Sequence, residues 1–461
     1  MKTRHRVIFA TSVCLVLLGQ LGLWRAKELV PVGAGRLSAM VVGETGKWGN
    51  GEIGNNIYTR SPSAFLISHS RYQISTGRLK QNFSDREINR KLISANTRFS
   101  FKLFSQILNK QPKENIFISP ASIALALAMT YNGASGSTQQ AIAKTLELQG
   151  ISVREVNLAN AALRESFVNI DPEVQLSIAN SLWIKDGEIF QPSFVENIHQ
   201  FYNGEAKNIN FRDDSATSAI NNWVNQSTDR KIDKIVDRIE PSTVFLLLNA
   251  ISFLGNWSYP FPKEATKDHP FTLLDGNQKI HPMMFREKIY NLPYLENELF
   301  QLVGLPYGKG RLSMYIFLPN PGISLSEFYQ HLNAENWEKW LDQLNNRQND
   351  VFEAISVGLP RFKLEYEIDL ENSLKSLGMD IAFRAEADFS AMTSLPLFIS
   401  FVKHKAFVEV NEQGTSAAAV TAVAGTRSPG IPMIVDRPFF CAIRDNETGA
   451  ILFMGSIVEP K

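Results

Sequence analysis

Cysteine is almost absent from this chain of 461 residues, which contains only Cys14 and Cys441. Cys14 lies in an apolar stretch near the N-terminus, and Cys441 lies in an apolar run that is typical of a buried strand. Two cysteines placed in this way exclude an internal disulfide framework. A thiol inside an apolar strand is expected to be buried and inert.

The sequence also lacks an excess of charge of either sign. Its 47 Lys and Arg residues are balanced by 46 Asp and Glu residues, which leaves a formal net charge of +1. Without a net positive field, there is no electrostatic reason to expect a nucleic acid or an anionic membrane surface as a partner. The hydrophobic share of 44% and the charged share of 20% are ordinary for a globular protein that buries a large core.

Residue clusters that hold metals or perform catalysis are missing as well. No two of the seven histidines lie within five residues of one another, so no local metal-binding pair exists. No paired carboxylates stand out, and the sequence at 133–136 favours a helix-ending turn over a nucleophile elbow. For His404, a structural hydrogen bond is the favoured role. The sequence therefore predicts neither an enzyme nor a bound metal or cofactor.

A long apolar stretch at the N-terminus follows a basic start. Lys2, Arg4 and Arg6 precede the apolar residues at 7–24, which is the pattern of an export signal. Residues 1–26 are therefore predicted to be a signal peptide or an uncleaved N-terminal anchor. The protein is expected to be exported: secreted, extracellular or periplasmic, or held at a membrane by that anchor.

Residues 27–92 contain little that could form a core. They include many glycine, serine, asparagine and arginine residues and show no sustained apolar period, which is typical of a flexible tether. One ordered domain is expected over the remaining residues, 93–461.

The hydrophobic period changes along this ordered part. Helical spacing dominates its first half, including a helix predicted over 120–133 with Ser119 as its N-cap. Strand-like runs dominate the second half. Because helices and strands are segregated rather than alternating, the sequence predicts an α+β fold. The other predicted elements are helices over 99–108 and 219–237, and strands over 244–253, 312–318, 401–410, 438–444 and 451–458.

The most informative segment lies between two of these strands, at 409–428. From Gly414 to Ala424 it contains no charged residue, no proline and no large side chain. Alternate side chains of a strand face opposite sides of a sheet, and here all of them are small enough to be buried on either side. Arg427 and Ser428 follow, and the bond between them is a cleavage site for a trypsin-like protease.

Six separated motifs resemble, in the expected order, those of the serpins, the serine protease inhibitors. The resemblance spans roughly residues 95–461. It implies a metastable fold in which helices pack on a five-stranded main sheet with smaller sheets beside it, and an exposed reactive loop lies at about residues 412–433. After attack by a protease, this loop is expected to insert into the main sheet as an extra strand. The motifs lie at 115–123, 248–257, 359–362, 377–379, 437–440 and 453–455.

The resemblance also implies roles for particular residues. The scissile bond is predicted at Arg427–Ser428. A cut after Ser428 remains open, because the commonest hinge spacing of the family favours it, whereas Pro429 makes that bond a poor substrate. The hinge is assigned to Glu412, Gln413, Gly414, Thr415, Ser416, Ala417, Ala418 and Ala419, and the gate that controls sheet opening to Ser119, Ser122, Asn249, Trp257 and His404.

The predicted function is that of a suicide-substrate inhibitor of trypsin-like serine proteases, acting as a monomer. The alternative is a non-inhibitory serpin that serves as a carrier, chaperone or binding module. The small, uncharged residues that follow Gly414 favour the inhibitor, because a bulky or charged hinge would resist insertion. No polyanion cofactor is expected, because the segment that resembles the family's heparin-binding helix, 138–148, contains only Lys144 as a basic residue.

Overall fold

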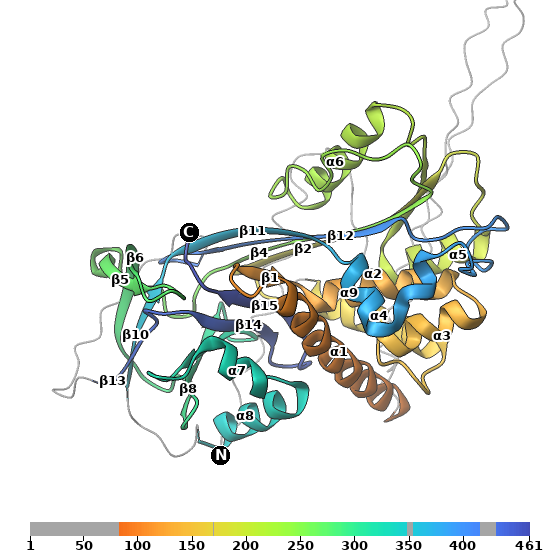
Figure 1. Ribbon diagram of the computed structural model, residues 1–461. Helices are drawn as coiled ribbons and strands as arrows, with labels where there is room; N and C mark the ends of the chain where they lie inside the picture. Colours follow the sequence, from red (N-terminus) through yellow and green to blue (C-terminus); the bar gives the residue numbers. More distant parts are fainter. Residues whose placement is uncertain (1–82, 169, 348–353, 415–429) are drawn as a thin grey trace, which may run out of the picture. The chain divides into compact units, whose positions relative to one another are not determined.

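The computed structural model describes residues 83–168, 170–347, 354–414 and 430–461 (Figure 1). The chain divides into two units, Met1–Ile74 and Ser75–Lys461, and all described residues belong to the second unit. The predicted leader at 1–26, and the predicted tether as far as residue 82, lie outside the described residues.

Helix α1 (Phe83–Lys110) begins inside the segment that the sequence assigned to the tether. Leu92 and Ala95 of this helix are buried, and Ile88 packs against the same core one turn earlier. This spacing places all three side chains on one face of the helix. The predicted start of the domain at residue 93 therefore falls within α1, because the apolar positions of its first turns are few and are separated by charged residues.

The remaining helices and strands follow in chain order. The helices are α2 (Pro120–Gly133), α3 (Gly136–Thr145), α4 (Val153–Phe167), α5 (Pro192–Asn197), α6 (Ser215–Ser227), α7 (Leu325–His331), α8 (Ala334–Arg347) and α9 (Glu371–Leu374), with short turns η1 (Ile198–Tyr202), η2 (Lys263–Ala265), η3 (Lys375–Met379) and η4 (Asp380–Phe383). The strands are β1 (Ile116–Ile118), β2 (Val174–Lys185), β3 (Glu205–Ile209), β4 (Phe245–Gly255), β5 (Lys267–Thr272), β6 (Gln278–Ile289), β7 (Tyr294–Glu296), β8 (Phe300–Tyr307), β9 (Leu312–Pro319), β10 (Ile355–Pro360), β11 (Phe362–Asp369), β12 (Phe401–Val410), β13 (Ile431–Ile434), β14 (Phe439–Asp445) and β15 (Ile451–Ile457).

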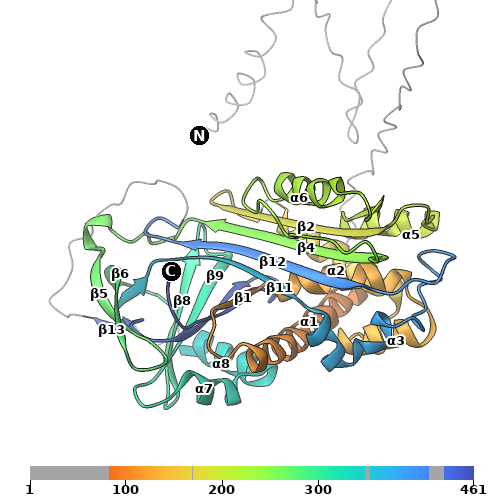
Figure 2. The same cartoon turned by 45° about the horizontal axis from the view of Figure 1, so that its top comes forward.

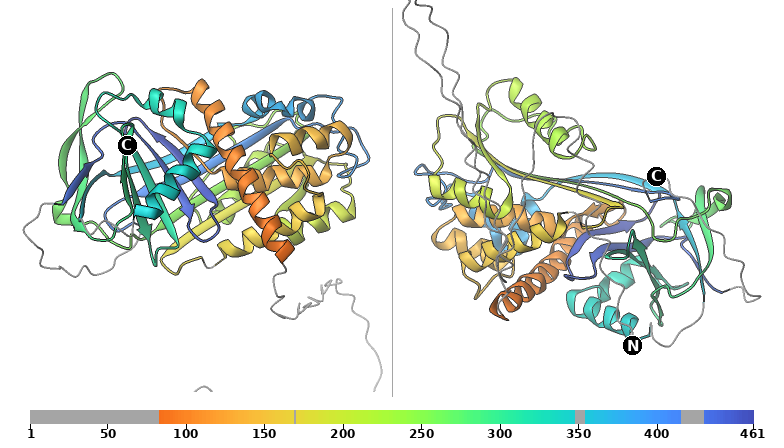
Figure 3. Two further views of the ribbon diagram at one scale, coloured as in Figure 1. Left: turned by 90° about the horizontal axis from the view of Figure 1, so that it is seen from below. Right: turned by 180° about the vertical axis from the view of Figure 1, so that it is seen from behind.

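These strands form three sheets. The five-stranded sheet has the order β11-β12-β4-β2-β3, the six-stranded sheet β1-β15-β14-β9-β8-β7, and the four-stranded sheet β13-β10-β6-β5. Figure 2 shows the strands of the five-stranded sheet side by side, with α6 over one face and α2 beneath the other. Figure 3 shows from below how α1 and its neighbouring helices lie against that second face. The predicted hairpin is present as the antiparallel pair β14–β15.

Strand β4 explains why the five-stranded sheet needs a cover on both faces. Every residue of β4 is buried. Leu246 and Leu248 pack in the cluster that includes Ile220 of α6, whereas Leu247 packs in the core that contains α2. A strand that is covered on both faces reads as a continuous apolar run, so the prediction of a buried strand here is confirmed.

The helix predicted over 219–237 is wrong in its second half. Helix α6 ends at Ser227, and Asp229 and Arg230 then have positive φ angles of 50° and 61°. Residues with positive φ do not continue a right-handed helix. Ile232 is fully buried as the helical pattern implied, but it lies in an irregular segment. Hydrophobic spacing alone could not distinguish these two ways of burying it.

A dense cluster of aromatic side chains lies between strands β8 and β9 of the six-stranded sheet and helices α7 and α8, and it provides a test of the packing. Phe317 of β9 is fully buried, with its ring centroid 5.1 Å from that of Phe300 and 5.6 Å from that of Trp337. Replacement by alanine should lower the free energy of unfolding by about 3–5 kcal/mol, because it removes buried surface and leaves a cavity. Urea denaturation monitored by tryptophan fluorescence would measure the loss. The control is Leu395→Ala at a half-exposed position (49%), which should change the free energy by less than about 0.5 kcal/mol. Equal effects in both variants would contradict the packing described here.

Candidate functional site

The five-stranded sheet contains a parallel strand pair, β4 and β12, beside its centre. Phe401 to Val408 of β12 pair with Leu246 to Phe253 of β4. Parallel pairs are slightly less stable per residue than antiparallel pairs. Because the chain leaves β12 at the end of the sheet where β4 also ends, a segment that turned back between the two strands would run antiparallel to both. This pair is therefore a place at which the sheet could accept another strand.

A cluster of buried polar side chains ties β4 to β12 and to the start of α2. His404 and Asn249 are direct partners in the register, and His404 Nδ1 lies 2.6 Å from Asn249 Oδ1. The Ser119 N–H donates to His404 Nε2 at 3.1 Å, and Asn249 Nδ2 donates to the Ser122 carbonyl oxygen at 3.1 Å. The structure thus brings together four of the residues that the sequence assigned to the gate.

The same contacts fix the protonation state of His404. Its Nε2 accepts a hydrogen from the Ser119 backbone, so Nδ1 carries the proton and donates it to Asn249. His404 is fully buried, and burial lowers its pKa from 6.5 to about 3. A neutral imidazole therefore links the two strands at physiological pH.

Sequence reasoning missed one member of this cluster, Asn180 of β2. Its Oδ1 accepts a hydrogen bond from Asn249 Nδ2 at 2.5 Å, and the two residues are register partners. The polar layer thus crosses three neighbouring strands, from β12 through β4 to β2. A signal was present in the sequence, because Asn180 and Ser181 interrupt an apolar strand-like run, and buried polar side chains require partners.

Beyond the end of β12, residues 411–413 are hydrogen-bonded to the segment that follows β4. The Phe261 N–H donates to the Glu412 carbonyl oxygen at 2.7 Å, and the Trp257 N–H donates to the Gln413 carbonyl oxygen at 3.0 Å. The Trp257 indole Nε1 also donates to the Asn411 carbonyl oxygen at 2.9 Å. Trp257, the fifth predicted gate residue, therefore lies at the predicted hinge rather than in the His404 cluster.

Glu412 adds side-chain contacts that the sequence did not indicate. It is buried, and its Oε1 accepts a hydrogen bond from the Thr266 hydroxyl at 2.8 Å. Its Oε2 lies 3.7 Å from Nε of the half-exposed Arg361. These partners lie in other parts of the chain, so only the tertiary structure could show them.

Gly414 marks the point where the described chain leaves the sheet. Its φ of +88° lies in the left-handed region, and a Cβ there would collide with the Gly255 carbonyl oxygen and the Trp257 backbone nitrogen. Glycine is therefore required in this arrangement. Gly255 is the last residue of β4, so Gly414 lies at the open end of the β4–β12 pair.

The rest of the predicted site lies outside the described residues: Thr415, Ser416, Ala417, Ala418 and Ala419 of the hinge, and the scissile pair Arg427 and Ser428. The chain is described again from Gly430, and β13 then pairs in parallel with β10. The two flanks of segment 415–429 are thus attached to different sheets, the five-stranded sheet before it and the four-stranded sheet after it.

Other kinds of site find little support in the described part of the chain. Within it, no group of three or more His, Cys, Asp or Glu side chains could hold a metal ion. None of the described helices is both long and apolar enough to cross a membrane. Cys441 is fully buried in β14, and burial raises its pKa to about 12, so its thiol stays protonated and unreactive.

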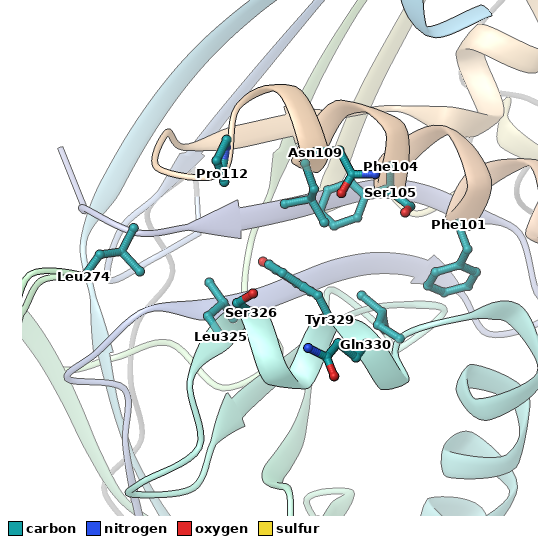
Figure 4. Close-up of a pocket in the computed structure, with 12 residues that line it drawn as sticks. Phe101, Phe104, Ser105, Asn109, Pro112, Leu274, Leu325, Ser326, Tyr329 and Gln330 are labelled. Carbon is teal, nitrogen blue, oxygen red and sulfur yellow. The ribbon is translucent and has the colours of Figure 1, made fainter. Parts of the chain in front are cut away.

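A cavity of about 480 Å³ lies between α1 and α7 (Figure 4). Its lining carries no charged residue and includes none of the predicted hinge or gate residues. It is therefore separate from the predicted hinge and gate. The lining residues are Phe101, Phe104, Ser105, Leu108, Asn109, Pro112, Leu274, Leu325, Ser326, Tyr329, Gln330 and Leu332.

The described part of the chain thus combines a five-stranded sheet, a buried polar cluster that joins β4 to β12, and a glycine with positive φ at the end of this strand pair. The chain belongs to the serpin family, because the family model described as Serpin (serine protease inhibitor) matches residues 94–460. The predicted α+β serpin fold is thereby confirmed.

Several known proteins are similar to this chain over most of its length. The leukocyte elastase inhibitor of Sus scrofa is 36% identical over 381 residues, which cover 80% of this chain and 99% of that protein. An uncharacterized serpin-like protein of Methanosarcina mazei is 32% identical and is covered to 93%, against 85% of this chain. The native-state structure of the thermophilic serpin tengpin has a TM-score of 0.73 and 34% identity, with 80% of this chain and 94% of that chain covered. The family is one of protease inhibitors, so the prediction that the chain is not an enzyme is also confirmed.

The prediction of export is wrong by the same comparison. The similar proteins include leukocyte elastase inhibitors and serpin B6, which belong to a group of intracellular, non-secreted serpins. The basic and apolar residues of the first 24 positions suggested export by their pattern alone, and these relatives do not support that reading.

The burial of His404 predicts that the free energy of unfolding depends on pH. Because the folded-state pKa of His404 is about 3 and the unfolded value is 6.5, the unfolded chain binds the extra proton. The stabilisation is complete above pH 6.5 and is lost as the pH falls toward 3. From pH 6.5 to 5 we expect a loss of about 1–2 kcal/mol in the free energy of unfolding, and this loss should be absent in His404→Gln. Urea titrations at the two pH values would test this. His331→Gln, at an exposed position, should retain the wild-type dependence; if His404→Gln also retained it, the assignment would fail.

The hinge contacts predict a local change in Glu412→Ala. Loss of the bond from Thr266 and of the ion pair with Arg361 should lower the free energy of unfolding by about 1–3 kcal/mol. The Trp257 and Phe261 amides, which donate to the hinge carbonyl oxygens, should then exchange faster with deuterium. Hydrogen-exchange mass spectrometry measures this, with Glu386→Ala at an exposed site as the control. Unchanged exchange in Glu412→Ala would show that its carboxylate does not hold the hinge.

Proposed function

We propose that this protein inhibits serine proteases as a suicide substrate, by inserting the segment after Gly414 between β4 and β12. The observation that carries the proposal is the position of Gly414 at the open end of this strand pair. The uncharged run from Thr415 to Ala424 matches in length the 10 residues of β12. An inserted strand of this length would run along the whole pair.

Insertion would exchange one parallel strand interface for two antiparallel interfaces. Each added residue gains backbone hydrogen bonds on both sides, and the small side chains of the run can be buried on either face of the sheet. The exchange also has a cost, because the His404–Asn249 hydrogen bond spans the gap that must open. The gate therefore acts as a barrier that keeps the five-stranded form in place until the loop is cut.

Cleavage by a target protease would release the loop while its new end is still esterified to the protease serine. Insertion of the released segment then moves the acylated protease away from the hinge before water can hydrolyse the ester. Distortion of the protease's catalytic geometry at the end of this movement keeps the complex covalent. This sequence of events requires a hinge with no bulky or charged side chain, which residues 415–419 provide.

The target class depends on which bond is cut. A cut at Arg427–Ser428 presents a guanidinium group, which suits the acidic primary pocket of trypsin-like proteases. We favour this bond because Pro429 follows Ser428 and disfavours the alternative cut.

A second candidate target is a protease of the elastase kind. Similar proteins at 34–36% identity are named leukocyte elastase inhibitors. A cut after Ser428 would present a small side chain, which suits the small primary pocket of elastase. The two open positions of the scissile bond therefore correspond to two different target classes.

One experiment decides between these targets and tests the mechanism. The full-length protein is mixed with trypsin or with elastase, and the products are run on a denaturing gel. We expect a covalent complex with trypsin that is lost in Arg427→Glu and persists in Ser428→Ala. Mass spectrometry of the released C-terminal fragment identifies its first residue, which is Ser428 in the favoured case.

A matched hinge variant separates inhibition from simple cleavage. Thr415→Arg should still be cut but should form little complex, because an arginine side chain cannot be buried cheaply in the sheet. Complex formation with elastase alone would replace the trypsin assignment. Cleavage of the wild-type protein by both enzymes without any complex would favour the non-inhibitory carrier or binding function.

A further inference from the structure

Two histidines face each other across the antiparallel strand pair β5–β6. His269 of β5 and His281 of β6 are direct partners in the register, and Figure 2 shows their strands side by side. Directly opposed residues of an antiparallel pair point to the same face of the sheet, with their Cβ atoms about 4.5–5.5 Å apart. The two residues are not neighbours in the chain, so the spacing of the histidines along the sequence did not indicate this pair.

A backbone carbonyl oxygen fixes one ring nitrogen of each histidine. His269 Nδ1 lies 2.9 Å from the Pro270 carbonyl oxygen, and His281 Nε2 lies 2.5 Å from the Arg361 carbonyl oxygen. A carbonyl oxygen only accepts hydrogen bonds, so these two nitrogens carry protons and donate them. In the neutral imidazole the opposite nitrogen, Nε2 of His269 and Nδ1 of His281, then keeps its lone pair.

These two opposite nitrogens are available to a ligand, since within the described ranges of the chain neither has a hydrogen-bond partner. A histidine that binds a metal commonly donates its second ring N–H to a backbone carbonyl, which fixes the tautomer and the orientation of the ring. The Phe285 ring also packs edge-on against His269, with centroids 5.8 Å apart. Both histidines are partly exposed, so an ion with its water ligands can reach them.

The lysines on the same two strands have partners of their own. Lys267 of β5 lies over the Phe285 ring at 4.7 Å, and Lys279 of β6 donates to the Glu459 carboxylate at 2.8 Å. The hydrogen bond from Lys279 lowers the pKa of Glu459, and His281 contributes a smaller electrostatic effect. Both ammonium groups are therefore engaged elsewhere, and a carboxylate lies near the histidine pair.

We propose that His269 and His281 together bind a divalent transition-metal ion, Zn²⁺, with water completing its coordination. Imidazole nitrogen is a preferred zinc ligand, and a four-coordinate ion leaves two positions for water. Among the described residues no group of three or more metal-ligating side chains exists, so this pair supplies the protein ligands by itself. Half the ligands of a structural zinc site should give about half its binding free energy, hence a Kd of about 10–100 µM. Mg²⁺ prefers oxygen ligands and should not bind.

Arg361 connects this pair to the predicted hinge. Its carbonyl oxygen accepts the hydrogen bond from His281, and its Nε lies 3.7 Å from the Glu412 carboxylate. Zinc bound to His281 would fix the ring and, through this hydrogen bond, the backbone of Arg361. If the proposed function holds, zinc should therefore slow strand insertion, but the binding itself does not depend on that function.

Isothermal titration calorimetry of the full-length protein with ZnCl₂ tests the site, and MgCl₂ is the control ion. We expect His269→Gln and His281→Gln each to raise the Kd for zinc at least about 10-fold, because each removes one of two ligands. His331→Gln, at an exposed position of α7, should bind zinc as the wild type does. Zinc should also raise the melting temperature of the wild type, by mass action, and leave that of the two ligand variants nearly unchanged.

Electron paramagnetic resonance with Cu²⁺, which also binds imidazole, counts the ligands directly. The wild-type spectrum should show coupling to two nitrogen ligands and that of His281→Gln to one, while near-ultraviolet circular dichroism reports whether the variant is folded. Absence of zinc binding by the wild type, binding that is unchanged in both glutamine variants, or coupling to fewer than two nitrogens in the wild type would each overturn the proposal. Zinc binding by a protein that fails to trap any protease would leave this site standing while the proposed function fails.

Discussion

The hydrogen bond between His404 and Asn249 joins the two strands around which the rest of the molecule is arranged. These residues are direct partners across a parallel strand pair, and the start of α2 supplies a further partner to each of them. The bond is fully buried, so losing it would leave polar groups unsatisfied inside the protein. It therefore holds β4 and β12 together inside the five-stranded sheet.

The predicted hinge and strand β2 both connect to this pair of residues. Gly414 lies at the open end of the same strand pair, and the Trp257 and Phe261 N–H groups donate to the carbonyl oxygens of the two residues that precede it. Asn180 extends the polar layer to β2 through its hydrogen bond with Asn249. The predicted hinge and four of the predicted gate residues therefore lie along one strand pair, β4 and β12, or in contact with it.

Local sequence patterns predicted the elements whose stability is itself local or repetitive. The Ser119 cap and the apolar run of β4 are read directly from neighbouring residues, and the structure has both. The start of α1 and the end of α6 were misplaced, because a few apolar positions can be buried either in a helix or in an irregular segment. Export was inferred from a basic and apolar pattern alone, and the comparison with intracellular relatives overturned it.

The sequence by itself determined the chemistry of the predicted hinge, since a run of small uncharged residues after Gly414 is a property of composition. Resemblance of separated motifs supplied the family and the gate residues. Only the tertiary structure placed His404 beside Asn249, 155 positions away, and gave Glu412 its partners Thr266 and Arg361. Strand order and register are set by burial over the whole chain, so contacts of this kind have no local pattern from which they could be read.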